Sequence, residues 1–284
     1  MTLKSVKKNE NDDRGFVFFG YDRFGASKNM AIDEVLKETA ESEHTNFIRF
    51  FDFLNPTIIL SISDSPKCIK EKAYSESVEI SRRRSGGKPI YIDNNVIAYT
   101  ITGVNLEGNE ELKYADRVHN YFGKRIIKSI EEITHVDASR IAIGEHFAIK
   151  VDGKPIAGHA QNIKPERAFF YHGVLAVADW DSASIEKFLR IPEKDLNELH
   201  GLPSLLGITQ AKMSLQEAKG RIVERMLANI TDGNYYKMGK EEKDKIITEA
   251  DKLVKEKYDT KDWILRSDTA NLNEESRFCL LYHD

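Results

Sequence analysis

The sequence predicts an α+β fold in which a mixed, largely antiparallel sheet packs against helices. Strand-like runs rich in β-branched and aromatic residues fill the first two thirds of the 284 residues, and only a few helical stretches cross between them. The last third is mainly helical. This order fits an α+β domain better than the regular strand and helix alternation of a parallel α/β sheet.

The chain begins with a polar segment that has nothing to bury. Residues 1–13 are dense in charge, so we expect a tail there and the first structured residue near Gly15. This polar start does not resemble a secretory signal, and no apolar run reaches the roughly 18 residues that cross a bilayer. The sequence therefore predicts a cytoplasmic protein without a membrane partner.

The bulk composition is that of an ordinary globular protein. Hydrophobic residues make up 40% of the chain and charged residues 31%, with a net charge of -4. Such a chain has no excess of positive charge to hold a phosphate backbone, which excludes nucleic acid as the main partner.

The first elements are a helix and two strands. Helical spacing of apolar residues predicts a helix over Asn29–Thr39, with Ser27 as a candidate N-cap. Phe47–Phe53 and Thr57–Ile62 have the composition of strands, and residues 54–56 between them form a turn that contains proline. We expect these two strands to be antiparallel neighbours.

The later elements follow from the same periodicities. Further strands are predicted at Val78–Arg83, Ile90–Ile101, Phe147–Val151, Lys154–Ala157 and Ala168–Val177. Further helices are predicted at Tyr114–Ile133, Ser182–Leu189, Leu215–Ile230 and Glu241–Tyr258. The pair Asp152-Gly153 is a strong two-residue hairpin signal between two of the strands.

One domain is the expected organisation. Gly233-Asn234 could mark a boundary, but the helix after it is amphipathic and must pack on something. We therefore assign residues 14–266 to one domain, with 234–266 as its terminal helical segment and 267–284 as a second tail.

The segment Arg82–Lys88 is the first candidate site. It reads R-R-R-S-G-G-K, a basic strand end that enters a glycine turn, whose backbone N–H groups and cations could hold an anion. A solvated cationic strand end is an equal alternative for so short a motif. It is not a Walker loop, because the required glycine and lysine spacing is missing.

Two further segments have both a structural and a functional interpretation. In Gly153–Gln161 the small residues Ala157, Gly158 and Ala160 could admit a ligand or could reflect tight strand packing. His172, in an apolar strand, is more often a hydrogen-bonded core residue than a catalyst. Cys68 and Cys279 form no disulfide framework and no metal or redox pair, so we expect two buried or idle thiols.

Taken in order, these segments resemble the cofactor-transferase family of lipoate-protein ligases, octanoyltransferases and, more distantly, biotin-protein ligases. Arg82–Gly87 is similar to the family's R-R-x-S-G-G loop, Gly153–Gln161 to its G-[RK]-K-I-x-G-S-A-Q hairpin, and His172–Leu175 to its H-G-x-L strand. The remaining matches are a first helix, its following strand and the end of the domain, at Asn29–Glu34, Phe47–Phe51 and Lys257–Trp263. The resemblance covers about residues 15–265.

The resemblance implies a groove that joins lipoate to ATP as an acyl-adenylate and then transfers the lipoyl group to a lysine. Magnesium would accompany ATP, with no tightly bound cofactor and no metal site in the chain. The acceptor would be a lipoyl-accepting domain of a 2-oxoacid dehydrogenase or a glycine-cleavage carrier protein, and the resemblance allows a separate accessory subunit. The implied substrate and nucleotide contacts are Arg82, Arg83, Ser85, Gly86, Gly87, Tyr91, Ile156, Gly158, His159, Ala160 and His172.

The sequence departs from the family at the position of its central lysine, which is Pro155. Proline has neither a charge nor an N–H. Lys154 is adjacent, but neighbouring side chains of a strand point to opposite faces, so it could substitute only through a bulge. Lys88 replaces the loop's third glycine and could supply the charge from the opposite wall. We therefore take Lys88 and Lys154 as the candidate catalytic residues.

Other family positions differ as well. The serine of G-S-A is His159, a family histidine is Ile92, and the G-R-x-Q segment reads Ser63–Pro66. One alternative is a protein that binds a lipoyl ligand or an acceptor domain without adenylation. A second is an octanoyl or lipoyl transferase, which would normally use a cysteine activated by the same lysine. Neither Cys68 nor Cys279 lies in the segment before the middle hairpin where one class carries it.

Overall fold

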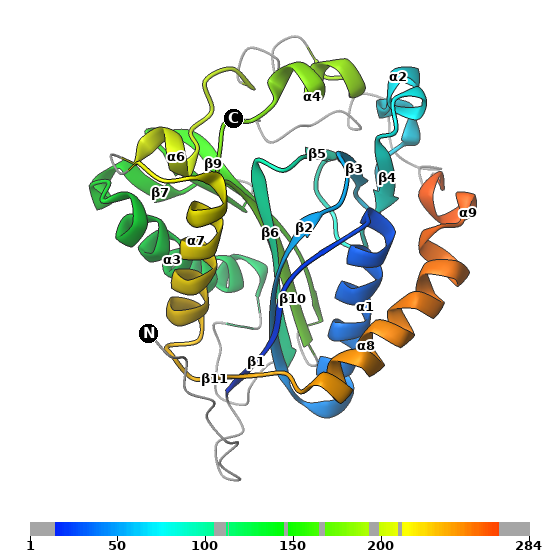
Figure 1. Ribbon diagram of the computed structural model, residues 1–284, viewed down its shortest axis with the longest axis horizontal. Helices are drawn as coiled ribbons and strands as arrows, with labels where there is room; N and C mark the ends of the chain where they lie inside the picture. Colours follow the sequence, from blue (N-terminus) through cyan, green and yellow to red (C-terminus); the bar gives the residue numbers. More distant parts are fainter. Residues whose placement is uncertain are drawn as a thin grey trace.

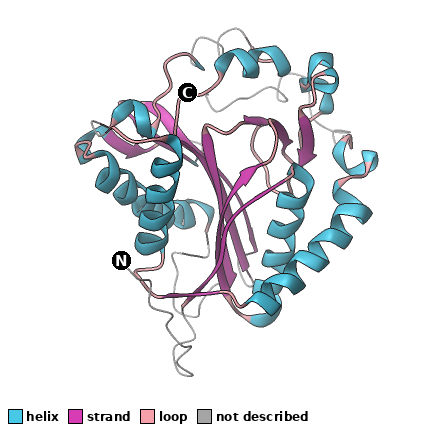
Figure 2. Cartoon of the chain, in the orientation of Figure 1, coloured by secondary structure: helices cyan, strands magenta, loops and turns pink. Residues whose placement is uncertain are grey.

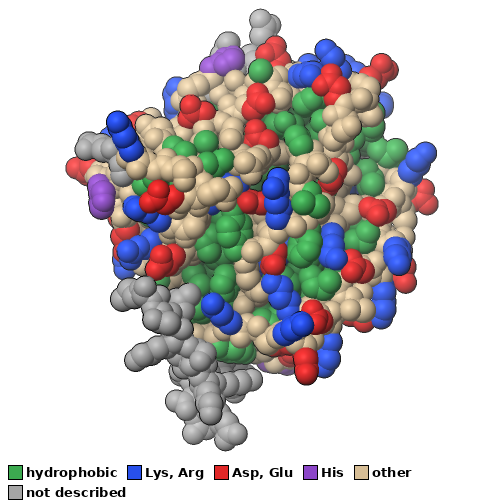
Figure 3. Space-filling view, viewed as in Figure 1, with side chains coloured by type: hydrophobic (Ala, Val, Ile, Leu, Met, Phe, Trp, Pro, Cys, Tyr) green, Lys and Arg blue, Asp and Glu red, His purple; other side chains and the backbone are tan. Residues whose placement is uncertain are grey.

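The computed structural model describes residues 15–104, 112, 114–144, 147–164, 168–192, 199–209 and 212–266. The two predicted tails and Cys279 lie outside these residues. Among the described helices, none is long and apolar enough to cross a membrane. On the face shown in Figure 3, positive and negative side chains are intermixed over the surface.

An eight-stranded mixed sheet forms the centre of the molecule (Figure 1). Its strands, in spatial order, are β11 (Tyr235–Lys237), β1 (Phe16–Phe24), β2 (Asn46–Phe53), β6 (Val96–Val104), β10 (Ala168–Ala176), β9 (Lys154–Lys164), β8 (Ala148–Val151) and β7 (Ile141–Ile143). The pairs β11·β1 and β1·β2 are parallel, and every other pair of this sheet is antiparallel. The predicted α+β class with a mixed, largely antiparallel sheet is confirmed.

Helices cover both faces of this sheet (Figures 1 and 2). On one face, α3 (Ala115–Thr134) and α7 (Leu215–Ile230) pack against alternate residues of β2 and β6, including Phe50 and Tyr99. On the other face, α1 (Ala26–Glu43) and α8 (Lys240–Leu253) pack against the intervening residues, including Phe51 and Ala98. The alternation of strand side chains thus divides the interior into two cores.

A smaller three-stranded sheet carries the glycine loop. Its central strand β3 (Thr57–Leu60) pairs in parallel with β4 (Glu79–Arg82) and antiparallel with β5 (Ile90–Ile92). The prediction that β2 and β3 are antiparallel neighbours is wrong. Both edges of β2 are already paired, with β1 and with β6, so β3 continues past the turn into a separate sheet.

Three local predictions need correction. The predicted strand Ile90–Ile101 is two strands, because the Asp93 side chain accepts from the Asn95 N–H at 2.8 Å and turns the chain. Ser27 is not the N-cap of α1, since Gly25 holds that place and Glu79 accepts from the N–H of Ala26. Strands β1, β7 and β11 were not predicted at all; β7 and β11 have only three residues each.

The C-terminal helices continue the packing on the α1 side. Ile246 and Ala250 of α8 are buried in the same core as Met30 of α1. A π-helical turn, Val254–Tyr258, then leads to α9 (Lys261–Ile264). That residues 14–266 form one unit stays a prediction. The other short helices are η1 (Pro66–Cys68), α2 (Glu71–Ser75), η3 (Ala138–Arg140), α4 (Ser182–Phe188) and α6 (Leu205–Ile208).

Candidate active site

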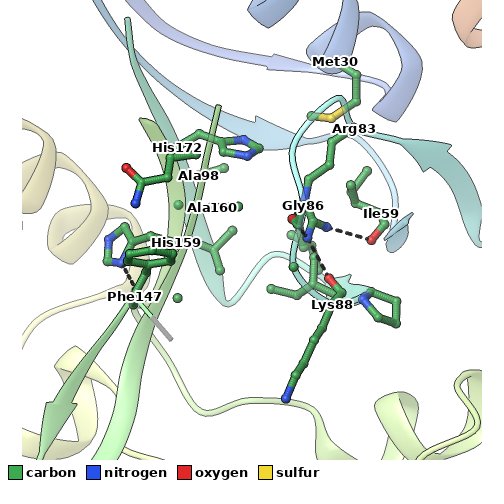
Figure 4. A pocket seen from close by; sticks show the side chains of 18 of the residues that line it. Met30, Ile59, Arg83, Gly86, Lys88, Ala98, Phe147, His159, Ala160 and His172 are labelled. Atoms are coloured by element: carbon green, nitrogen blue, oxygen red, sulfur yellow. Dashed lines mark hydrogen bonds between the residues drawn. The ribbon is translucent and has the colours of Figure 1, made fainter. Parts of the chain in front are cut away.

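A cavity of about 310 Å³ lies between two walls that come from the two sheets (Figure 4). The loop wall consists of Ile59 on β3 and the loop residues Arg83, Gly86, Gly87, Lys88 and Pro89. The strand wall consists of the residues of β6, β9 and β10 that face α1, namely Ala98, Gly158, Ala160, His172 and Val174. Apolar side chains complete the lining, including Met30, Phe51, Phe53, Ile90, Ile92 and Phe147.

Small residues on the strand wall make this space. His172 is directly opposite Ala160 on β9, and Val174 is directly opposite both Gly158 and Ala98. Opposed residues of an antiparallel pair share one face, so these positions opposite His172 and Val174 carry only methyl groups and a hydrogen atom. Of the three predicted small residues, Gly158 and Ala160 line the cavity, where they leave room for a ligand together with Ala98, whereas Ala157 is buried in the α3 core.

Arg83 holds the glycine loop in place through hydrogen bonds. Its guanidinium donates to the carbonyls of Gly86 at 2.7 Å and Lys88 at 2.8 Å, and to Ser85 Oγ at 3.1 Å. Burial lowers the pKa of Arg83 to about 10. Gly87 has a φ of +92°, and a Cβ there would lie 3.0 Å from Arg83 Nη2. The second arginine of the motif thus fixes the loop, and glycine fits beside it.

Arg82 points away from the cavity. Its side chain donates to backbone carbonyls of the preceding turn and of the C-terminal segment, namely Ser61, Asp64, Trp263, Ile264 and Arg266. All three of its nitrogens are engaged in this way. The structure therefore does not bring Arg82 together with the other predicted nucleotide contacts.

Ser85 and His172 meet at the junction of the two walls. Ser85 Oγ lies 2.6 Å from His172 Nε2, although the two residues are 87 positions apart. Both side chains are buried, and His172 lines the cavity. Burial, and next the positive charge of Arg83, lower the pKa of His172 to about 3, so its imidazole is neutral near pH 7.

His159 lies on the other face of β9, in the core beneath α3. It is opposite Gly173, which is opposite Tyr99, and its ring stacks on Tyr171 at a centroid distance of 4.9 Å. A Cβ on Gly173 would lie 2.4 Å from the His159 ring, so glycine there makes room for it.

Hydrogen bonds fix the His159 ring in one orientation. Its Nδ1–H donates to the Phe147 carbonyl at 2.6 Å, and its Nε2 accepts from the Tyr99 hydroxyl. Burial holds the pKa of His159 well below its usual range. His159 forms part of the cavity wall, but its ring nitrogens are occupied by the core.

The two candidate catalytic lysines differ in position. Lys88 lines the cavity, and Figure 4 shows its side chain extending away from Arg83. Lys154 is exposed at the β8–β9 hairpin, where its Nζ approaches the Gly201 carbonyl at 3.4 Å. A register irregularity does occur, between Ile149 and Lys150 of β8, but it does not bring Lys154 into the cavity.

The remaining predicted contacts lie outside the cavity. Ile156 is fully buried in the α3 core, and Tyr91 packs on Phe188 with ring centroids 5.8 Å apart. Pro155 and Tyr91 line a separate small apolar pocket of about 30 Å³. The sequence analysis missed the apolar lining residues Met30, Phe51, Phe53 and Phe147. Nothing in their local sequence distinguishes them from core residues.

No metal cluster or reactive thiol is found among the described residues. No group of three or more His, Cys, Asp or Glu side chains in that part of the chain could hold a metal ion. Cys68 is buried in a separate core around α2 and α4, and burial raises the pKa of its thiol to about 12. A thiol of this kind is a poor nucleophile at neutral pH.

Comparisons with known proteins agree with the geometry. Residues 26–226 match the family model of the lipoyl protein ligase A/B catalytic domain. An octanoyltransferase, LipM of Carboxydothermus hydrogenoformans, is 23% identical over 273 residues, which span 88% of this chain and 98% of that protein.

Two solved structures share the fold. A structure of a lipoate-protein ligase A bound with ATP has a TM-score of 0.69 and 13% identity, covering 88% of this chain and 98% of the other. A bi-partite lipoate protein ligase from Thermoplasma acidophilum, studied with its E2 lipoyl domain, has a TM-score of 0.69 and 14% identity. That match covers 90% of this chain and 100% of the other.

Proposed function

Because the chain belongs to the family of lipoyl protein ligase A/B catalytic domains, we propose that it joins a lipoyl-sized or octanoyl-sized acyl group to a lysine of a lipoyl-accepting domain. The apolar cavity carries this proposal. Its volume of about 310 Å³ is at the lower end for small-molecule sites. Most of its lining is apolar, with Arg83 and Lys88 on the loop and His159, Gln161 and His172 on the strands as its polar side chains. A medium-length acyl chain with one polar end has this shape and polarity.

The first route to an activated acyl group uses ATP. Lipoate and MgATP would give an acyl-adenylate and pyrophosphate, and the related lipoate-protein ligase A that binds ATP is consistent with this route. Lys88 is the cation best placed to meet the carboxylate or phosphate, since Arg82 and Arg83 donate to backbone carbonyls. No carboxylate lines the described cavity, so magnesium would be held by the nucleotide's own phosphates.

The second route takes the acyl group from a thioester, as an octanoyltransferase does. The engagement of both arginines favours this route, because a thioester brings no triphosphate that needs cations. The octanoyltransferase relative, which this chain matches over 98% of its length, points the same way. The usual cysteine nucleophile is not supplied by Cys68, which lies in another core.

The third possibility is binding without activation. Pro155 stands where the family has its lysine and lies outside the cavity lining, so a protein that only holds a lipoyl ligand or an acceptor domain fits this feature. It differs from the two catalytic routes by a simple observable, the covalent state of the acceptor.

One experiment separates the three. A lipoyl domain is incubated with the protein and either lipoate plus MgATP or an octanoyl thioester, and the domain's intact mass and pyrophosphate release are recorded. We expect the domain to gain one acyl group with at least one donor. Pyrophosphate release identifies the ATP route. An unmodified domain with both donors, despite measurable binding of lipoate or octanoate, would leave only the binding function.

A further inference from the structure

We propose that Ser85 is the nucleophile that carries the acyl group, with His172 as its general base. The proposal rests on the lysine-acylation function and deepens it by naming a covalent intermediate. Its basis is the 2.6 Å buried contact between Ser85 Oγ and His172 Nε2, of which His172 lines the cavity. A hydroxyl within hydrogen-bond reach of a neutral imidazole, beside a site that fits an acyl chain, is the arrangement that nucleophilic acyl transfer requires.

The hydrogen bonds around Ser85 orient its proton toward His172. Arg83 Nε can only donate, and it donates to Ser85 Oγ at 3.1 Å. No carbonyl or carboxylate among the described residues accepts from this hydroxyl, so its proton is available to His172 Nε2. The nearby guanidinium also stabilises the negative charge that develops on Oγ as the proton leaves.

His172 is neutral and is a weak base. Its pKa of about 3 reflects burial first and the charge of Arg83 second, so its Nε2 can accept the hydrogen bond of Ser85 at neutral pH and takes the proton only as the hydroxyl attacks. His172 lines the cavity directly. A group entering the cavity therefore reaches the imidazole directly, whereas the buried Ser85 hydroxyl is reached past Gly86.

Backbone N–H groups of the glycine loop can stabilise the oxyanion. Within the described part of the chain, the amides of Gly86 and Gly87 donate to no acceptor. A Cβ built on Gly86 would meet nothing within 4 Å, so the loop is open at the residue next to Ser85. Ser85 itself is only 1% exposed, which means that the acyl carbonyl must approach over Gly86. The two glycines thus provide both access and donors.

The chemistry balances in two steps. Ser85 Oγ attacks the carbonyl of the activated acyl group, His172 takes the hydroxyl proton, and the thiolate or AMP departs. A departing thiolate takes that proton from His172, and after AMP departs His172 releases it to solvent, so the imidazole is neutral again before the second step. The acceptor lysine, as a neutral amine, then attacks the Ser85 ester, loses its proton to His172, and Ser85 Oγ leaves and recovers that proton. No redox partner is needed, and the acyl donor may be a thioester or an acyl-adenylate.

The test looks for the acyl-enzyme itself. The full chain is mixed with an octanoyl thioester in one arm and with lipoate plus MgATP in the other, without acceptor, and quenched in acid. Intact mass and peptide mapping should show one acyl group on the peptide that contains Ser85. The arm that yields the adduct identifies the donor.

Variants separate chemistry from folding. Ser85→Ala should lose the adduct and reduce transfer to the lipoyl domain roughly 100-fold or more. Ser85→Cys should restore an adduct that neutral hydroxylamine cleaves, as expected of a thioester. Ser81→Ala, in the buried strand just before the loop, is the matched control and should behave as the unmodified chain.

Three results are decisive. Acylation of the lipoyl domain with no adduct on Ser85, or with Ser85→Ala transferring within about twofold of the unmodified chain, overturns the proposal while the lysine-acylation function stands. An adduct on Ser85 without transfer to the domain supports the dyad and contradicts the proposed acceptor. If neither adduct nor transfer appears although octanoate binds, both proposals are wrong.

Discussion

The chain contains the tripeptide Gly-Lys-Pro twice, and the fold uses the two copies differently. All three residues of the first copy, Gly87, Lys88 and Pro89, line the cavity. Gly153-Lys154-Pro155 forms the β8–β9 hairpin, where the lysine is exposed and the proline lies against a separate apolar pocket. The second copy is the one that resembles the family's lysine motif. Identical local sequence therefore does not decide which lysine serves the site.

The difference arises from what surrounds each copy. The carbonyls of Gly86 and Lys88 accept from buried Arg83, which holds the first copy against the cavity. The second copy completes a two-residue turn in which Asp152 and Gly153 both have positive φ. That turn geometry directs Lys154 outward. Four predictions test whether the contrast holds.

The largest effect is expected from closing the space between the walls. Ala160 on β9 lies 4.0 Å from where a Cβ on Gly87 would stand, so Ala160→Phe should fill the gap. We expect octanoate or lipoate to bind at least about 100-fold more weakly, measured by calorimetry. Ala142→Phe, at an exposed position of β7, is the control and should leave affinity unchanged. Equal affinities for both variants would place the acyl site elsewhere.

The two lysines give the next effect. Lys88→Ala should lower kcat/KM for lipoyl-domain acylation roughly 10- to 100-fold, because the cavity loses its cation. Lys154→Ala should stay within about twofold, since its ammonium lies at the surface. Steady-state kinetics with both variants checks this. The opposite ranking would show that the hairpin lysine reaches the site after all.

Histidines on the two faces of the strand wall predict a dependence of stability on pH. Burial lowers the pKa of His172 on β10 to about 3 and that of His119 on α3 to about 4. Their folded-state pKa values lie below the usual 6.5, so the two neutral histidines contribute their full stability to the folded state above pH 6.5. This contribution is lost as the pH falls toward 3. Each proton taken up on unfolding gives a slope of about 1.4 kcal/mol per pH unit.

One buried carboxylate acts in the opposite direction. Burial raises the pKa of Asp33 to about 6, so protonation below that pH favours the folded state and partly offsets the histidines. Urea unfolding should still show that the free energy of unfolding decreases as the pH is lowered from 7 to 4. His172→Gln should make this decrease with pH less steep. A stability that rises steadily toward pH 4 would contradict the neutral, buried histidines.

The smallest effect is expected from replacing the glycine of each tripeptide by alanine. Gly153 has a φ of +78° with open space around it, so Gly153→Ala should cost about 1 kcal/mol of stability and leave acyl transfer unchanged. Gly87→Ala meets Arg83 Nη2 as well, so it should also reduce transfer. Urea unfolding and the transfer assay on both variants measure this. Equal activity in the two variants would mean that the loop shape does not matter.

The sequence predicted most strands and the glycine loop because their periodicity and turn residues are local signals, but it missed the nine-residue β1. It could not predict that β3 leaves β2, since this depends on β1 and β6 occupying both edges of β2. The same limit applies to the site. The motif named Arg82 and Arg83 together, but only the fold shows that Arg82 holds the C-terminal segment while Arg83 holds the loop.

The most direct test of the central claim is the mass of a lipoyl domain after incubation with this protein and an activated acyl donor. The acyl cavity and its glycine loop predict a gain of one acyl group on a single lysine, lost with Ala160→Phe and retained with Ala142→Phe. An unmodified domain with both an octanoyl thioester and lipoate plus MgATP would contradict it.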